Sequence, residues 1–193
     1  IHVVMVPVFK KPEEEEAVLA KMREFKELME RAGLTVKIDD RDNLRSGFKY
    51  AEWELKGAPV RIARGPRDLE NRTAEVVRRD TLEKEFVNWD SLVEHVAALM
   101  EQIQQNIYKK ALDFRNANTY KVDSWDEFKQ KIEEGGFLLC HWDGTKETEA
   151  KIQEETKATI RCIPIDSFVC EEEGKCVYSG KPSKRRVIFA KSY

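Results

Sequence analysis

Apolar residues follow two different periods along the first forty residues of the chain. Residues 2–9, HVVMVPVF, form a short valine-rich run that is typical of a buried strand. Apolar residues then recur at helical spacing between Pro12 and Ala32, and Gly33 ends this pattern. Residues 34–38 alternate between apolar and polar again. The pattern predicts a strand, a helix and a second strand that lies parallel to the first, joined by a right-handed crossover.

The next change of period lies within residues 47–68, GFKYAEWELKGAPVRIARGPRD. Residues 48–55 have the spacing of a short helix, and Gly57 stands where a left-handed residue would end it. Residues 59–63 begin with a proline and then alternate, which predicts a strand. Because Gly65 and Pro66 follow directly, we expect a turn over residues 65–72. The segment therefore predicts a helix, a tight corner, a strand and a basic turn.

The remaining pattern predicts a long helix and then a smaller group of elements. Residues 73–79 form a strand that we expect to pair antiparallel with its neighbour, because only a short turn separates them. Leu92, Val96, Leu99, Ile103 and Ile107 make one stripe of a helix that runs to about Arg115. Further helices are predicted over residues 124–134 and 145–155, and further strands over residues 137–140, 159–163 and 187–190.

These elements predict an α/β fold with two domains. The first is a mixed-sheet α/β domain over residues 1–105, and residues 106–120 form a helical linker. A small α/β (α+β) domain follows over residues 121–193. A chain of 193 residues is long enough for two such domains, each with its own core.

Composition adds limits on location. Charged residues make up 36% of the chain, and no apolar run approaches the roughly 20 residues that span a bilayer. We therefore expect a soluble protein without a membrane partner. The chain opens on Ile1 without a signal sequence, so we expect a cytoplasmic protein and a piece or processed product of a longer one.

Charge is unevenly distributed. The net charge of the whole chain is only −2, yet residues 41–79 contain ten Lys or Arg against six Asp or Glu, a formal charge of +4. A local basic stretch can attract phosphates without making the whole protein basic. An ordinary solvated face is the alternative, and it stays open at this point.

The corner also carries a resemblance. EWELKG, the P-x-R that follows it, and GPRD resemble the anticodon-binding domain of prolyl-tRNA synthetases, in the class II branch with an extra C-terminal domain. The stretches GTKETEAKIQEETKATIRCIP and GKCVYSGKPSKRRVIFAKSY resemble that extra domain. The resemblance covers essentially the whole chain. It implies that the tail ending at Tyr193 folds back toward a catalytic domain; the alternative is a frayed end.

The resemblance implies roles for particular residues. Glu54, Arg61 and Arg67 fall on the motif positions that contact anticodon bases. Arginine matches the O6 and N7 acceptors of guanine, and a carboxylate matches its N1–H and N2–H donors when the base is unstacked. A plain surface role for Glu54, or a salt bridge to Arg61, remains the alternative. Charge alone suggests four phosphate contacts: Lys49, Lys56, Arg78 and Arg79.

Metal sites are not expected. The four cysteines, Cys140, Cys162, Cys170 and Cys176, lack Cys-x-x-Cys spacing. Some members of the similar family hold zinc through two cysteine pairs, and the resemblance puts Asp143 and Thr148 at the first pair and Cys176 and Tyr178 at the second. We therefore expect no zinc, and a buried Cys162. The acidic run Asp39, Asp40 and Asp42 lacks nearby His or Cys, so we expect no metal there either.

Function follows from the resemblance. It implies that this chain recognises the anticodon of tRNA(Pro) within a proline–tRNA ligase, a homodimer whose upstream domain uses ATP and magnesium to attach proline to tRNA(Pro). No nucleotide-binding or catalytic motif occurs in the chain itself, so we expect no catalytic residue here. A small-anion-binding regulatory α/β module is the alternative, and a purely structural interaction domain is a third possibility.

Overall fold

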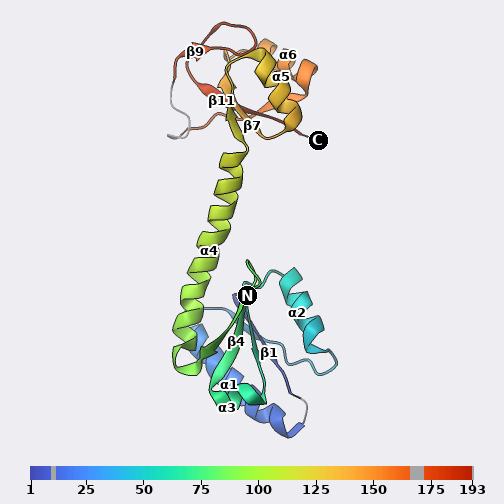
Figure 1. Cartoon of the computed structure of the whole chain (residues 1–193), viewed down its shortest axis with the longest axis vertical. Helices are drawn as coiled ribbons and strands as arrows, with labels where there is room; N and C mark the ends of the chain where they lie inside the picture. Colours follow the sequence, from blue (N-terminus) through green and yellow to red (C-terminus); the bar gives the residue numbers. More distant parts are fainter. Residues whose placement is uncertain (10–11, 166–171, 193) are drawn as a thin grey trace. The chain divides into compact units, whose positions relative to one another are not determined.

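The structure is a computed structural model that describes residues 1–9, 12–165 and 172–192. The chain divides into two compact units, residues 1–110 and 111–193 (Figure 1). The border between them falls inside the long helix α4, Leu92–Ala117. Cys170 and Tyr193 lie outside the described residues.

A five-stranded mixed sheet, in the order β2-β1-β3-β4-β5, forms the centre of the first unit. β1 pairs parallel with β2 and β3, whereas β4 pairs antiparallel with β3 and β5. The expected parallel pairing of the first two strands and the expected antiparallel pairing of residues 73–79 are confirmed. The strands are Val3–Pro7 (β1), Val36–Ile38 (β2), Val60–Arg64 (β3), Thr73–Arg78 (β4) and Lys84–Asn88 (β5).

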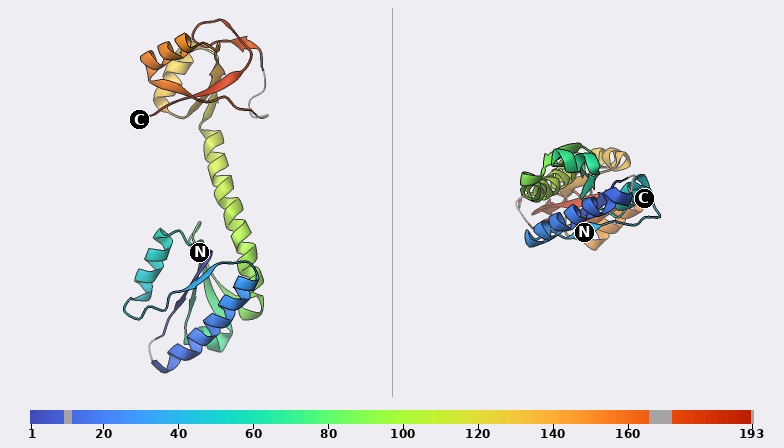
Figure 2. Two further views of the ribbon diagram at one scale, coloured as in Figure 1. Left: turned by 180° about the vertical axis from the view of Figure 1, so that it is seen from behind. Right: turned by 90° about the horizontal axis from the view of Figure 1, so that it is seen from below.

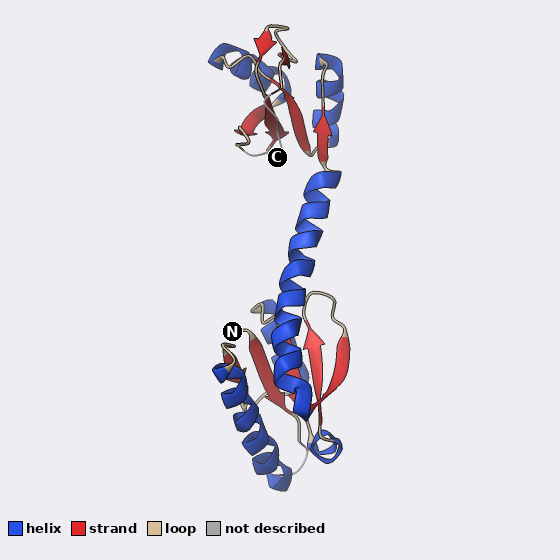
Figure 3. Cartoon of the chain, turned by 90° about the vertical axis from the view of Figure 1, so that its left-hand side faces the viewer, coloured by secondary structure: helices blue, strands red, loops and turns tan. Residues whose placement is uncertain are grey.

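Helices cover the two faces of this sheet unequally. The main core packs α1, Pro12–Arg31, and α4 against one face, where Ile62 and Val76 are buried. On the other face, Trp53 of α2, Ser46–Leu55, packs against Val4 and Val6 of β1. Figures 2 and 3 show α1 and α4 on the same side of the strands, with α2 on the other side. No described helix is both long and apolar enough to cross a membrane.

The first unit differs from the sequence prediction at two places. The expected turn over residues 65–72 contains a helix, α3, Pro66–Asn71. Proline is compatible with the first helical position, and the Asp68 carboxylate accepts a hydrogen bond of 2.8 Å from the Gly65 backbone N–H. Strand β5 was not predicted, because Val87 is its one buried residue and a single buried position makes no period.

The long helix begins after a 3₁₀ turn, Trp89–Ser91. Its buried stripe is shorter than predicted. Leu92, Val96, Leu99 and Ile103 are buried, as expected, but Ile107 is exposed. The helix contributes to the core of the first unit only through its first twelve residues, and its periodic pattern continues beyond that contact.

The second unit has a four-stranded sheet in the order β6-β7-β11-β8. β6 pairs parallel with β7, and β11 pairs antiparallel with β7 and β8. Phe128, Ile132 and Ile152 fix two helices on this sheet. The elements are Thr119–Lys121 (β6), Trp125–Glu134 (α5), Phe137–His141 (β7), Lys146–Thr156 (α6), Ala158–Cys162 (β8), Gly174–Lys175 (β9), Pro182–Ser183 (β10) and Arg186–Lys191 (β11).

The predicted α/β class is confirmed, with two further corrections. Residues 119 and 120, expected in the helical linker, belong to β6 of the second sheet. Cys162, expected to be buried, is exposed at the end of β8, whereas Cys140 and Cys176 are buried. The prediction for Cys162 assumed that apolar and polar residues alternate between the two faces of the strand without a break. The pairing of β8 with β11 shifts register at this point, so the alternation does not extend to Cys162.

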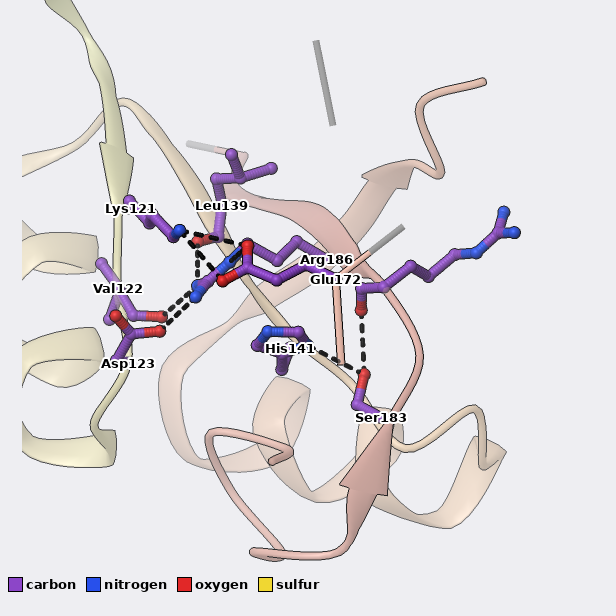
Figure 4. Close-up of polar contacts among 9 residues, drawn as sticks. Lys121, Val122, Asp123, Leu139, His141, Glu172, Ser183 and Arg186 are labelled. Carbon is purple, nitrogen blue, oxygen red and sulfur yellow. Dashed lines mark hydrogen bonds and ion pairs between the residues drawn. The ribbon is translucent and has the colours of Figure 1, made fainter. Parts of the chain in front are cut away.

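A buried arginine ties the β6 end of the second unit to its last strand (Figure 4). The Arg186 side chain donates to a carboxylate oxygen of Asp123 at 2.5 Å and to one of Glu172 at 3.1 Å. It also donates to the carbonyls of Val122 and Leu139, both at 3.3 Å. Hydrogen bonds from Arg186, and then from Lys121, lower the pKa of Glu172 to about 2. One guanidinium therefore satisfies four acceptors from three segments of the chain.

We expect Arg186→Met to destabilise the second unit by about 2–3 kcal/mol, because hydrogen bonds to charged groups are lost and the carbonyls of Val122 and Leu139 each lose a donor. Amide hydrogen exchange of β7 and β11 measures this, since it reports on each unit separately. Lys184→Met, at an exposed position close by, is the matched control. Unchanged exchange in Arg186→Met would contradict the structural role of the network.

Candidate nucleic-acid interface

The position of α2 is fixed by the buried carboxylate of Asp39, directly after β2. The Trp53 indole N–H donates to it at 2.8 Å, and the Arg41 guanidinium donates to both of its oxygens at 2.7 Å. The hydrogen bonds from Arg41 lower the pKa of Asp39; burial opposes this shift, and the bond from Trp53 adds to it. Asp39 is therefore an ionised anchor for the helix, and its oxygens are already occupied by donors.

Lys49 belongs to the same anchor. Its side chain is buried, and Nζ donates to the backbone carbonyl of Asp39 at 3.1 Å. A lysine in this position does not face solvent. The structure therefore does not support the expected phosphate contact at Lys49.

Arg61 lies on β3, on the sheet face opposite the main core. Its guanidinium carbon stands 3.7 Å from the centre of the Tyr50 ring, and Nη1 lies 3.4 Å from a carboxylate oxygen of Glu75. Its Nε is buried without a hydrogen-bond partner in the described structure. Stacking on Tyr50 and pairing with Glu75 hold the guanidinium in one orientation, so little side-chain entropy remains to be lost when it binds a ligand.

Glu54 lies exposed in the last turn of α2, and its carbonyl accepts a 2.8 Å bond from Arg79 Nε. The alternative salt bridge to Arg61 is not formed in the described structure, where Arg61 pairs with Glu75. Glu54 borders an open hollow of about 710 Å³, which we call the α2 hollow. It is lined by Ala51, Glu54, Leu55, Arg79, Asp80, Leu82, Ile107 and Lys110.

Arg67 lies exposed in the first turn of α3 and borders a second hollow of about 550 Å³, which we call the β5 hollow. Tyr50, Glu75 and Phe86 line it as well. The structure therefore does not bring Glu54 and Arg67 into one hollow. Arg61 contacts residues from the walls of both hollows. It lies on Tyr50 and pairs with Glu75, which line the β5 hollow. It also shares a small cavity of about 10 Å³ with Glu54, which lines the α2 hollow.

The remaining expected phosphate contacts differ in exposure. Arg78 donates to both oxygens of Asp80, at 2.8 and 2.7 Å, and Asn106 of α4 donates to the same carboxylate. This geometry assigns Arg78 to holding the β4–β5 connection. Arg79 is exposed and lines the α2 hollow. Lys56 is exposed as well, pairs with Glu52 and lies over the Trp53 ring.

Sequence reasoning missed the burial of Arg64 in the first unit. Arg64 is fully buried, and its three guanidinium nitrogens have no hydrogen-bond partner in the described structure. The carbon of its guanidinium group lies 3.9 Å from the centre of the Trp89 ring. Burial lowers its pKa to about 10, against the attraction of Asp68 and Glu24, so it stays protonated at neutral pH. Its alternation with Val60 and Ile62, which face the core, was the available signal.

The positions that the resemblance linked to zinc form a hydrogen-bonded cluster in the second unit. Asp143 accepts from the hydroxyl groups of Thr145, Thr148 and Ser179 at 2.9, 2.8 and 2.6 Å. The Ser179 backbone N–H donates to Cys176 Sγ at 3.4 Å. Among the described residues, no group of three or more His, Cys, Asp or Glu side chains is placed to hold a metal ion.

One of the four positions linked to zinc lies outside this cluster. Tyr178 donates its hydroxyl to Glu155 at 2.7 Å. The side chain that reaches Asp143 is that of the next residue, Ser179. Only the fold shows which of the two side chains turns toward Asp143.

Two family models match the chain. The model described as "Anticodon binding domain" covers residues 2–99, and the one described as "Prolyl-tRNA synthetase, C-terminal" covers residues 125–193. The chain therefore belongs to the anticodon-binding domain family. Its two matched parts, in this order, form a C-terminal region of the prolyl-tRNA synthetase type, which confirms the resemblance found in the sequence.

Curated relatives agree with this assignment. The proline–tRNA ligase of Bacteroides fragilis is 57% identical over 195 residues, and that of Phocaeicola vulgatus is 54% identical over 197. The enzyme of Flavobacterium johnsoniae is 51% identical over 194 residues. Each alignment covers 100% of this chain but only 39% of the relative. The chain thus spans about two fifths of the length of the relatives that it matches.

We expect Asp143→Asn to destabilise the second unit by about 1–3 kcal/mol near neutral pH, since an amide cannot accept all of these hydrogen bonds. Burial raises the pKa of Asp143, but hydrogen bonds from Ser179, Thr148 and Thr145 outweigh it and lower the pKa to about 2. The carboxylate therefore stabilises the fold above its unfolded pKa of 3.8, and this contribution disappears as the pH falls through about 2.

Urea unfolding at several pH values measures this difference, and Asp126→Asn, at an exposed carboxylate of α5, is the control. The gap between Asp143→Asn and the unaltered chain should narrow as the pH falls below about 4. A gap independent of pH would show that the ionised carboxylate is not the stabilising group. Zinc retained at about one equivalent through dialysis would contradict the hydrogen-bonded interpretation of the cluster.

Proposed function

We propose that this chain recognises the anticodon loop of tRNA(Pro) as the C-terminal part of a proline–tRNA ligase. The observation that carries the proposal is the anticodon-binding family match over residues 2–99, which contains the corner where Arg61 lies on Tyr50 and pairs with Glu75. The names of the relatives support the choice of proline as the amino acid. The same family match favours RNA over the small anion that the sequence left open as an alternative ligand.

The chemistry of the corner suits guanine. Proline codons require anticodons that end in two guanines, and each unstacked guanine offers acceptors to arginine and donors to a carboxylate. The Glu54 carboxylate lines the α2 hollow, and Glu75 and Arg67 line the β5 hollow. We assign one guanine to each hollow, with Arg61 between them.

In this proposal Glu54, Arg61 and Arg67 contact bases, as the resemblance implies. Arg79 and Lys56, which are both exposed, contact phosphates. We do not propose Arg78 and Lys49 as phosphate contacts, because Arg78 donates hydrogen bonds to Asp80 and Lys49 donates one to the Asp39 carbonyl. They support the interface by fixing the β4–β5 connection and α2.

The parent enzyme supplies the chemistry. We propose that a catalytic domain outside this chain activates proline with ATP and magnesium and transfers it to tRNA(Pro). The full-length protein is then a cytoplasmic homodimer, and this chain contributes tRNA selection without catalytic residues of its own. The names of the relatives and the share of their length that this chain spans support this division of labour.

We expect Arg61→Ala to abolish the preference for guanine while weak, salt-dependent binding persists. The measurement is a fluorescence-anisotropy titration with a tRNA(Pro) anticodon stem-loop and with a copy whose two guanines are changed to adenine. The guanine loop should bind the altered chain about 5- to 150-fold more weakly, the effect of one lost bidentate base contact. Arg23→Ala, an exposed arginine on α1, is the matched control.

Equal binding of both loops by the unaltered chain would show that the corner is a phosphate surface without base selection. Failure to bind either loop at low salt would overturn the proposed function of the chain.

Arg79→Gln should weaken binding of both loops to the same degree, because a phosphate contact carries no sequence information. The slope of log affinity against log salt should become shallower by about 0.7 to 0.9. Titrations at four salt concentrations provide the slope. A change in guanine preference without a change in slope would instead assign Arg79 to a base.

A further inference from the structure

Phe86 is an exposed aromatic residue on the unpredicted edge strand β5. Its side chain is 67% exposed, and it lies directly opposite Glu75 in the antiparallel pairing of β4 and β5. Val87 points into the main core, so Phe86 points to the other face, which also carries Arg61 and Glu75. Phe86 therefore belongs to the same surface as the residues proposed to read bases.

Three aromatic residues line the β5 hollow, Phe9, Tyr50 and Phe86, and they differ in what covers their rings. The Tyr50 ring carries the Arg61 guanidinium at 3.7 Å. Phe86 has no ring or cation partner among the described residues. Of the three residues only Phe86 is exposed, whereas Phe9 and Tyr50 are partly buried. The ring of Phe86 therefore has a face open to a ligand.

Comparison with another phenylalanine shows what is particular about Phe86. Phe114 on α4 is 69% exposed, so exposure alone does not distinguish the two. Only Phe86 borders a hollow of about 550 Å³ that also has Arg67 and the Glu75 carboxylate in its wall. A flat apolar surface beside a cation and a carboxylate matches the face of an unstacked base and the acceptors and donors on its edge.

We propose that Phe86 is a stacking platform for one unstacked base of the bound RNA loop, a role that rests on the proposed function of the chain. The base lies flat on the ring in the β5 hollow, with its edge toward Glu75 and Arg67. Stacking on a ring tolerates every base, so Phe86 contributes affinity and orientation. Selection of guanine stays with the arginine and carboxylate groups around it.

The test uses the whole chain and the tRNA(Pro) anticodon stem-loop, with Phe86→Leu, Phe86→Trp and the control Phe114→Leu. Leucine keeps an apolar side chain but removes the ring, so affinity should fall at least about fivefold. Tryptophan keeps a stacking surface, so its affinity should stay within about threefold of the unaltered chain. The salt slope should not change in any variant, because none alters a charge.

A second measurement identifies the stacked base. Each anticodon position of the stem-loop is replaced in turn by 2-aminopurine, whose fluorescence changes when it stacks on an aromatic ring. One position should respond on binding to the unaltered chain and to Phe86→Trp, and lose that response with Phe86→Leu. A structural role of Phe86 would not produce this position-specific signal.

The outcomes separate the two proposals. If the unaltered chain prefers the guanine loop but Phe86→Leu binds it equally well, with the same 2-aminopurine response, the stacking role is wrong and the proposed function stands. If Phe86→Leu and Phe114→Leu weaken binding equally, the effect is not local and the stacking role is also wrong. Absence of any binding by the unaltered chain overturns both proposals.

Discussion

The first unit depends on one buried carboxylate, Asp39. It lies where β2 ends, and it receives hydrogen bonds from Trp53 of α2 and from Arg41, while Lys49 binds its carbonyl. Strand β2 and helix α2 are thereby joined across a loop whose residues are otherwise mostly exposed. Because Tyr50 and Glu54 stand on α2, the same anchor sets where they meet β3. The orientation of Arg61 thus follows from a charge that never reaches the ligand surface.

The second unit uses the same principle twice, with different chemistry. Arg186 collects acceptors from three segments, and Asp143 collects hydroxyl donors from three side chains. A buried charge is costly unless its hydrogen bonds are satisfied, so each cluster is stable only when all of its segments are in place. Both clusters lie beside the apolar core around Phe128, which includes Val122 and Val177 of the same segments.

Most helices and strands follow from residue periodicity, because one face of each is buried against a continuous core. The exceptions have physical reasons. Strand β5 has one buried side chain and no period, and α3 begins with Gly-Pro, which is as typical of a turn as of a helix start. At the interface, the sequence supplied Glu54, Arg61 and Arg67 through a motif. It did not predict that Lys49 and Arg78 are held by hydrogen bonds within the fold, or that Phe86 lies opposite Glu75, since these depend on contacts between different segments of the chain.

The position of β5 at the edge of the sheet has a consequence for solubility. Strand β5 pairs with β4 on one side, and its outer backbone groups are of the kind to which a strand from another molecule can add. An exposed ring on such a strand would favour this association, but the charged side chains of Lys84 and Glu85 directly precede Phe86. They act as gatekeepers against aggregation. The edge can therefore display one aromatic ring to solvent, and the charges beside it limit how far that apolar surface extends.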